Sequence, residues 1–167
     1  MSEVLVRPPR TCDGEGAARA WLDFAEYYTK LAPEAFQVPR SEGLAEWIEQ
    51  RLLGVYSPDD FVRVAELAGE TVGFVDATFL PPDSEAPWQL VREVVVPRVF
   101  VNALAVQARH WRAGIGTRLM TAVEDWGRAR RARLIVLDTY THSPISVPFY
   151  EQRMEYTRQS LRFAKPL

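Results

Sequence analysis

Hydrophobic and polar positions change their spacing along the chain, and each spacing predicts a type of element. Alanine, leucine and aromatic residues recur at helical spacing from about Glu15 to Leu31, and Asp13 is the expected N-cap of this helix. Apolar residues between Ser41 and Gly54 predict a second helix. A short strand at Glu3–Arg7, ended by two prolines, precedes both helices.

Strand patterns dominate the middle of the chain. Phe61–Leu67 and Thr71–Ala77 flank a Gly-Glu turn, which predicts an antiparallel hairpin. The segment Pro81–Pro97 carries four prolines and is expected to be mostly loop, with a short strand at Val94–Val96. A further strand is predicted at Val99–Val106, which is rich in β-forming residues.

The clearest helix of the chain begins after Gly114, where apolar residues form one stripe and charged residues the other face. A buried strand at Leu134–Leu137, a short helix at Ile145–Met154 and a closing strand at Thr157–Ala164 are predicted to follow. This order of elements predicts one α/β domain over residues 1–167. Its central sheet is expected to be mixed and largely antiparallel, with helices on both faces.

Composition and charge narrow the classes of function. Of the 167 residues, 47% are hydrophobic and 25% charged, and the net charge is −2, which gives no reason to expect a nucleic-acid or anionic membrane partner. Cys12 is the only cysteine and is expected to be a small buried residue. The two histidines have no zinc-ligand spacing, so no metal is expected. Since no signal-peptide core or long apolar stretch occurs, a cytoplasmic location is predicted.

A strand, loop and helix around Gly114 carry the strongest chemical signal. The N-terminus of a helix has unpaired N–H groups and a partial positive charge, which favour a phosphate. Gly114 and Gly116 allow the backbone to approach such a ligand closely, and Arg112 and Thr117 add a cation and a hydroxyl group. The pattern therefore predicts a phosphate or diphosphate site.

Spacing excludes two common phosphate motifs. A dinucleotide fingerprint requires glycine where Leu119 stands. A P-loop requires lysine after its last glycine, but Gly116 is followed by Thr117. A tight strand-to-helix turn without a ligand stays open as an alternative.

The surrounding sequence resembles the GNAT superfamily of N-acetyltransferases. The stretch Leu104–Met120 is similar to the acetyl-CoA motif of that family, and Ser143–Glu151 resembles its second motif. Three residues depart from the family pattern: Trp111 replaces the usual Arg or Gln, Ser143 a common Asn, and Glu155 a common Gly. The resemblance implies a single GNAT-like domain.

The resemblance also implies a site for acetyl-CoA. The backbone of Leu104–Val106 would pair with the pantetheine arm, and an N–H group near Ala105 or Val106 would polarise the thioester carbonyl. Tyr150 is the candidate general acid for the leaving thiolate. The residues expected to bind the cofactor are Leu104, Ala105, Val106, Trp111, Arg112, Ala113, Gly114, Ile115, Gly116, Thr117 and Ser143.

No general base is assigned from the sequence. Family members often carry Glu four residues before the terminal Val of the strand, and here that position is Asn102. Glu93, Asp138 and Glu26 are candidates for a base that acts through water. Because the first helix borders the acceptor side in this fold, Asp23 and Glu26 are also candidates to meet a cationic amine.

The predicted function is direct transfer of an acyl group from acetyl-CoA to an amine of a small molecule, peptide or protein. The alternative is a non-catalytic acyl-CoA-binding regulatory module, which Asn102 favours. A nucleotide-dependent, kinase-like enzyme is the third hypothesis, and the missing lysine after Gly116 argues against it. A homodimer is left open, because terminal strands can leave an edge for pairing.

Overall fold

The computed structural model describes residues 3–54 and 57–166, and these divide into two compact units between Leu137 and Asp138. In chain order the first unit contains β1 (Leu5–Arg7), α1 (Gly14–Leu31), α2 (Leu44–Leu53), β2 (Asp60–Leu67), β3 (Glu70–Leu80), β4 (Arg98–Val106), α3 (Ile115–Ala129) and β5 (Leu134–Leu137). Short 3₁₀ helices lie at Ala86–Trp88, Arg92–Val95 and Ala108–His110. The second unit contains α4 (Ser146–Pro148) and a π-helical turn at Phe149–Arg153.

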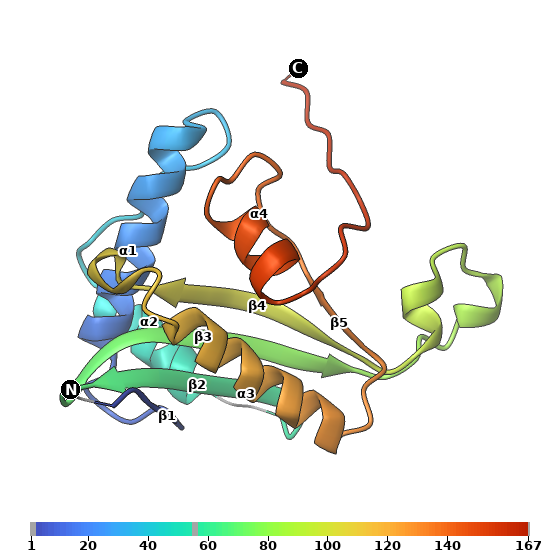
Figure 1. The fold of residues 1–167 in the computed structure, drawn as a ribbon, viewed down its shortest axis with the longest axis horizontal. Coiled ribbons are helices and arrows are strands. Elements are labelled where there is room, and N and C mark those ends of the chain that lie inside the picture. The colour runs from blue at the N-terminus through green and yellow to red at the C-terminus, as the bar shows by residue number, and fades with distance from the viewer. Residues whose placement is uncertain (1–2, 55–56, 167) are drawn as a thin grey trace. The chain divides into compact units, whose positions relative to one another are not determined.

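The strands of the first unit form a five-stranded sheet in the order β1-β2-β3-β4-β5 (Figure 1). All neighbouring pairs are antiparallel except β4 and β5, which are parallel. The mixed, largely antiparallel sheet predicted from the sequence is therefore confirmed. The predicted antiparallel hairpin is confirmed as well. Its turn lies one residue earlier than predicted, at Ala68 and Gly69 with φ angles of +53° and +84°, because Glu70 already belongs to β3.

Helices cover both faces of this sheet, as the alternation of side chains along β2 requires. Val62 and Val64 pack into a buried cluster with α1 and α2. Phe61 points to the opposite face, where its ring stacks on Trp126 of α3 at a centroid distance of 4.9 Å. The helices therefore lie on the two faces of the sheet that the sequence pattern predicted.

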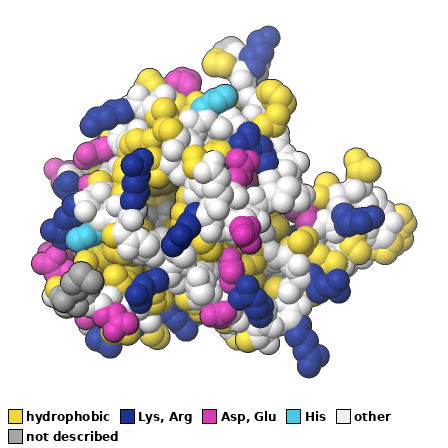
Figure 2. Space-filling view, viewed as in Figure 1, with side chains coloured by type: hydrophobic (Ala, Val, Ile, Leu, Met, Phe, Trp, Pro, Cys, Tyr) yellow, Lys and Arg dark blue, Asp and Glu magenta, His cyan; other side chains and the backbone are white. Residues whose placement is uncertain are grey.

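A projecting segment between β3 and β4 stands outside this core (Figure 1). Its side chains Trp88 and Leu90 are 82% and 98% exposed. Figure 2 shows hydrophobic side chains on the surface of the same projection. The short strand predicted at Val94–Val96 is wrong, because Arg92–Val95 forms a 3₁₀ helix ahead of Pro97 instead.

The closing strand predicted at Thr157–Ala164 is also wrong, since this segment has no regular secondary structure. A strand is stabilised by pairing and by burying one face. The two large apolar residues of the segment, Leu161 and Phe163, are 61% and 89% exposed. The helix expected at Ile145–Met154 is confirmed as helical structure, but it is split into an α turn and a π turn.

Two expectations about the start of α1 need correction. Asp13 stands at the N-cap position, but its side chain makes no cap hydrogen bond. Its carboxylate instead accepts hydrogen bonds from Arg7 at 2.8 and 2.9 Å and from Thr71 at 2.5 Å. Cys12 is exposed rather than buried, and it stands in a turn with a left-handed φ of +78°.

No helix in residues 3–54 and 57–166 is both long enough and apolar enough to cross a bilayer.

Candidate functional site

One edge of β4 is unpaired beyond the point where its pairing with β5 ends. The two strands pair only from Arg98 to Val101, whereas β4 continues to Val106 (Figure 1). Leu104–Val106 pair with β3 on one side, and no other described strand pairs with them on the opposite side. An extended ligand with amide groups can add to such an edge as a strand would.

The loop after β4 leads directly to the start of α3. Two of its residues have left-handed backbone, Arg112 with φ of +64° and Gly114 with φ of +81°. A Cβ atom at Gly114 would meet nothing within 4 Å, so the space in front of the helix is open.

The first N–H groups of α3 have no acceptor inside the helix. The first N–H group bonded to the helix cap is that of Arg118, which donates to the Gly114 carbonyl at 3.1 Å. No described side chain caps the start of α3. The amides of Ile115, Gly116 and Thr117 thus lie at the positively polarised end of the helix dipole, where an anion such as a phosphate group is favoured.

Trp111 has a structural partner that the sequence did not reveal. Its indole Nε1–H donates to the Val106 carbonyl oxygen at 2.6 Å, and its ring contacts Tyr27 edge-on at 5.3 Å. Burial and the neighbouring Tyr28 raise the pKa of Tyr27, while the positive charge of Arg112 opposes that rise. Trp111 therefore connects the loop to the end of β4 and to α1.

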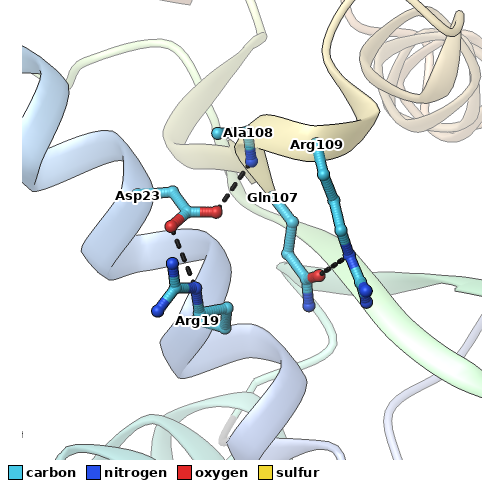
Figure 3. Close-up of a pocket in the computed structure, with 5 residues that line it drawn as sticks. All are labelled: Arg19, Asp23, Gln107, Ala108 and Arg109. Carbon is cyan, nitrogen blue, oxygen red and sulfur yellow. Dashed lines mark hydrogen bonds and ion pairs between the residues drawn. The ribbon is translucent and has the colours of Figure 1, made fainter.

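Polar side chains also attach the end of β4 to α1, around a cavity of about 450 Å³ (Figure 3). Asp23, which is buried, accepts a hydrogen bond from the Ala108 N–H at 2.8 Å and forms an ion pair with Arg19, whose Nε lies 3.0 Å from Asp23 Oδ1. The Asp23 carboxylate thus holds the loop after β4. Asp23 and Glu26 were both predicted to meet a cationic acceptor, and of these two only Glu26 is exposed.

Gln107 makes a second attachment that sequence reasoning missed. Its side-chain amide donates to the carbonyl oxygens of Gly16 and Thr71 at 3.1 and 3.0 Å. The signal available in the sequence was a glutamine directly after the apolar residues of a predicted strand. These bonds fix the end of β4 against α1 and β3.

A polar group on β3 and β4 was also missed. The Asn102 amide donates to Asp76 Oδ1 at 3.1 Å and to Thr78 Oγ1 at 2.9 Å. The register between the strands shifts by one residue after Asp76, so Asn102 lies at a β-bulge. The signal available in the sequence was the single aspartate of the otherwise largely apolar predicted strand Thr71–Ala77.

The first unit brings together Leu104–Val106 and the loop from Trp111 to Thr117, whereas Ser143 and Tyr150 belong to the second unit. The Ser143 hydroxyl accepts a hydrogen bond from the Ser146 N–H at 3.0 Å. Tyr150 lies in the π-helical turn, where its ring contacts those of Phe149 and Tyr156.

The other proposed bases occupy dissimilar positions. Asp138 forms an exposed ion pair with Arg162 at 3.7 Å within the second unit. Glu93 is half-buried in the projecting segment of the first unit.

Comparison with known proteins gives a family match and fold matches. Residues 20–156 match the model of the Acetyltransferase (GNAT) family. A search of curated protein sequences returned no significant match.

Solved structures share the fold at low sequence identity. A mutant of the BH1408 protein from Bacillus halodurans matches with a TM-score of 0.79 and 18% identity, over 98% of this chain and 99% of that one. AAC(6')-Iy, solved with the bisubstrate analog CoA-S-monomethyl-acetylneamine, matches with a TM-score of 0.63 and 19% identity, over 99% and 100%. Glucosamine-6-phosphate N-acetyltransferase from Arabidopsis thaliana gives a TM-score of 0.64 and 12% identity, over 98% of each chain.

Proposed function

Because this chain belongs to the Acetyltransferase (GNAT) family, we propose that it transfers the acetyl group of acetyl-CoA directly to an amine. The acceptor is an amine of a small molecule, a peptide or a protein. Two of the solved structures that share the fold are an aminoglycoside acetyltransferase and a glucosamine-6-phosphate N-acetyltransferase, and both names describe acetylation of an amine-bearing compound. This similarity supports the class of reaction, while the acceptor of this chain is to be found by assay.

The observation that carries the proposal is the free edge of β4 followed directly by the uncapped start of α3. Leu104–Val106 offer backbone amides to the pantetheine arm of acetyl-CoA. The amides of Ile115–Thr117 would hold the diphosphate, and Arg112 adds positive charge beside them. Ser143 belongs to the second unit, and its part in cofactor binding stays a prediction from the sequence.

The proposed reaction needs stabilisation of negative charge and a proton for sulfur. A backbone N–H group of Ala105 or Val106 would donate to the thioester oxygen as negative charge develops there. The amine nitrogen forms a bond to the acetyl carbon, and the carbon–sulfur bond breaks. Tyr150 is proposed to donate its phenolic proton to the thiolate and to regain one from solvent.

A non-catalytic acyl-CoA-binding module is the second candidate function. Asn102 favours it, because an amide at this position of β4 cannot accept a proton from the acceptor. Such a module would bind acetyl-CoA without releasing CoA in the presence of an amine.

Thiol release from acetyl-CoA across a panel of amines separates the two functions. The panel consists of an aminoglycoside, glucosamine 6-phosphate, a polyamine and a lysine-containing peptide, each assayed with and without the protein. The transferase proposal predicts release that depends on both protein and amine, with a product heavier by one acetyl group. Thermal stabilisation by acetyl-CoA without amine-dependent release would favour the regulatory module instead.

A further inference from the structure

The carboxylates of the first unit differ in whether a positively charged side chain pairs with them. Most of those near the sheet form ion pairs: Asp13 and Glu66 with Arg7, Asp23 with Arg19, Asp59 with Arg130, and Glu70 with Arg109. Asp76 accepts a hydrogen bond from the uncharged amide of Asn102, and no described arginine or lysine forms an ion pair with it. Its negative charge therefore remains available to an incoming cation.

Asp76 also lies beside the part of β4 that the proposed function uses. It stands opposite Ala103 in the β3–β4 ladder, one residue before Leu104. The unpaired edge of β4 faces away from β3, so a ligand paired there lies about two strand spacings of ~4.8 Å from the β3 backbone. The Asp76 side chain would bridge this distance to the amine directly or through one water. Asp76 is half-buried, on the face where Phe74, two residues earlier, contacts the Trp21 ring of α1.

The amide of Asn102 fixes the direction of this carboxylate. One of its N–H groups donates to Asp76 Oδ1 and the other to Thr78 Oγ1. The Thr78 hydroxyl in turn donates to Asp60 Oδ1 at 3.3 Å. Because both amide hydrogens are engaged, Oδ2 of Asp76 is left to accept a proton, and no described group donates to it.

We propose that Asp76 is the general base of the transfer and that Asn102 is its positioning residue, an inference that rests on the acetyltransferase function proposed above. A primary amine such as that of lysine has a pKa of about 10.4 and is protonated at neutral pH, so it must lose a proton to attack. Of the two protons that the ammonium group loses, one passes through Asp76 to solvent. The other balances the proton that sulfur gains.

The variant Asp76→Asn tests this role with the amine that the panel identifies as the fastest acceptor. We expect kcat/KM at pH 7 to fall by about 10²–10³-fold. The dissociation constant for CoA should stay within about twofold, and activity should recover as the pH approaches the pKa of the amine. Glu70→Gln is the matched control, since it makes the same change at an exposed carboxylate of the same strand, and its turnover should match wild type.

Asn102→Ala tests the positioning role separately. It should lower kcat by roughly tenfold and move the acidic limb of the pH–rate profile, because Asp76 is retained but loses its donor.

Wild-type turnover and an unchanged pH profile in Asp76→Asn would overturn the assignment and leave the transferase proposal intact. Loss of CoA binding in Asp76→Asn would also overturn it, by showing a structural role. A wild-type protein that binds CoA but acetylates no amine would overturn both proposals.

Discussion

At the scale of single residues, the ion pair of Arg7 and Asp13 connects β1 to the start of α1. Both side chains are buried, and the carboxylate accepts two hydrogen bonds from the guanidinium group. Loss of the Asp13 charge would break this buried pair and leave Arg7 with Glu66 as its remaining ion-pair partner among the described residues. Asp13→Asn should therefore lower the free energy of unfolding by about 3 kcal/mol in urea denaturation.

An exposed pair provides the control for this prediction. Asp125→Asn removes one of the two carboxylates that pair with Arg128 on the surface of α3, the other being Glu124, and should change the free energy of unfolding by less than about 0.5 kcal/mol. Equal effects of the two substitutions would contradict the role given to Asp13.

The same residue predicts how stability depends on pH. Burial by itself would raise the pKa of Asp13, but hydrogen bonds from Arg7, Thr71 and the Arg10 N–H outweigh it and lower the pKa below its ordinary value. As the pH falls, Asp13 is protonated in the unfolded chain, at a pKa of about 3.9, before it is protonated in the folded chain. The stability that the ionised Asp13 contributes to the folded state is therefore present above this pH and is lost as the pH falls further. Below about pH 5 the wild type should lose stability more steeply than Asp13→Asn.

Tyr150 carries the most specific chemical prediction at this scale. Tyr150→Phe keeps the ring that contacts Phe149 and Tyr156 but removes the proton that the thiolate is proposed to take. We expect kcat to fall by about 10²-fold or more, with CoA affinity unchanged, in steady-state thiol-release assays. Full turnover with the wild-type pH dependence would show that the phenol is not the acid.

At the scale of elements, the start of α3 is the feature on which the cofactor site depends. A negative charge there interacts favourably with the helix dipole but repels a phosphate group. The stability of the fold and the affinity for CoA should therefore change in opposite directions. Thr117→Asp should leave the free energy of unfolding unchanged or raise it by up to about 1 kcal/mol. It should also weaken CoA binding at least about tenfold in calorimetry.

Thr121→Asp is the matched control, because it adds the same charge one helical turn further along an exposed position of α3. Its CoA affinity should fall much less than that of Thr117→Asp. Equal loss in both variants would indicate general repulsion rather than a site at the helix start.

The elements also show what the sequence could and could not predict. The strand, turn and start of α3 were predictable because Gly114 and the apolar stripe that follows it act locally. The contact between Asp76 and Asn102 was not, because it depends on a one-residue register shift between two strands. The strand predicted at Thr157–Ala164 failed because an alternating pattern does not show whether a partner strand exists.

At the scale of the whole molecule, the C-terminal tail after Tyr156 is expected to contribute little to stability. It has no regular structure, and the family match ends at residue 156. A chain that ends at Tyr156 should keep its free energy of unfolding within about 0.5 kcal/mol of the full chain in urea denaturation. A loss above about 2 kcal/mol would indicate that the tail packs against the rest of the protein, as the predicted closing strand required.

Cytoplasmic location and homodimer formation stay predictions at this scale. Analytical ultracentrifugation of the full chain would measure its oligomeric state directly, and the chain that ends at Tyr156 would show whether the tail contributes to any dimer.

The most direct measurement for the whole account is a calorimetric titration of the protein with CoA and, in parallel, with pantetheine, which lacks the diphosphate. If the amides of Ile115–Thr117 hold that group, CoA should bind with one-to-one stoichiometry and at least about tenfold more tightly than pantetheine. Absence of heat at near-millimolar CoA, or equal affinity for both compounds, would contradict a diphosphate site at the start of α3.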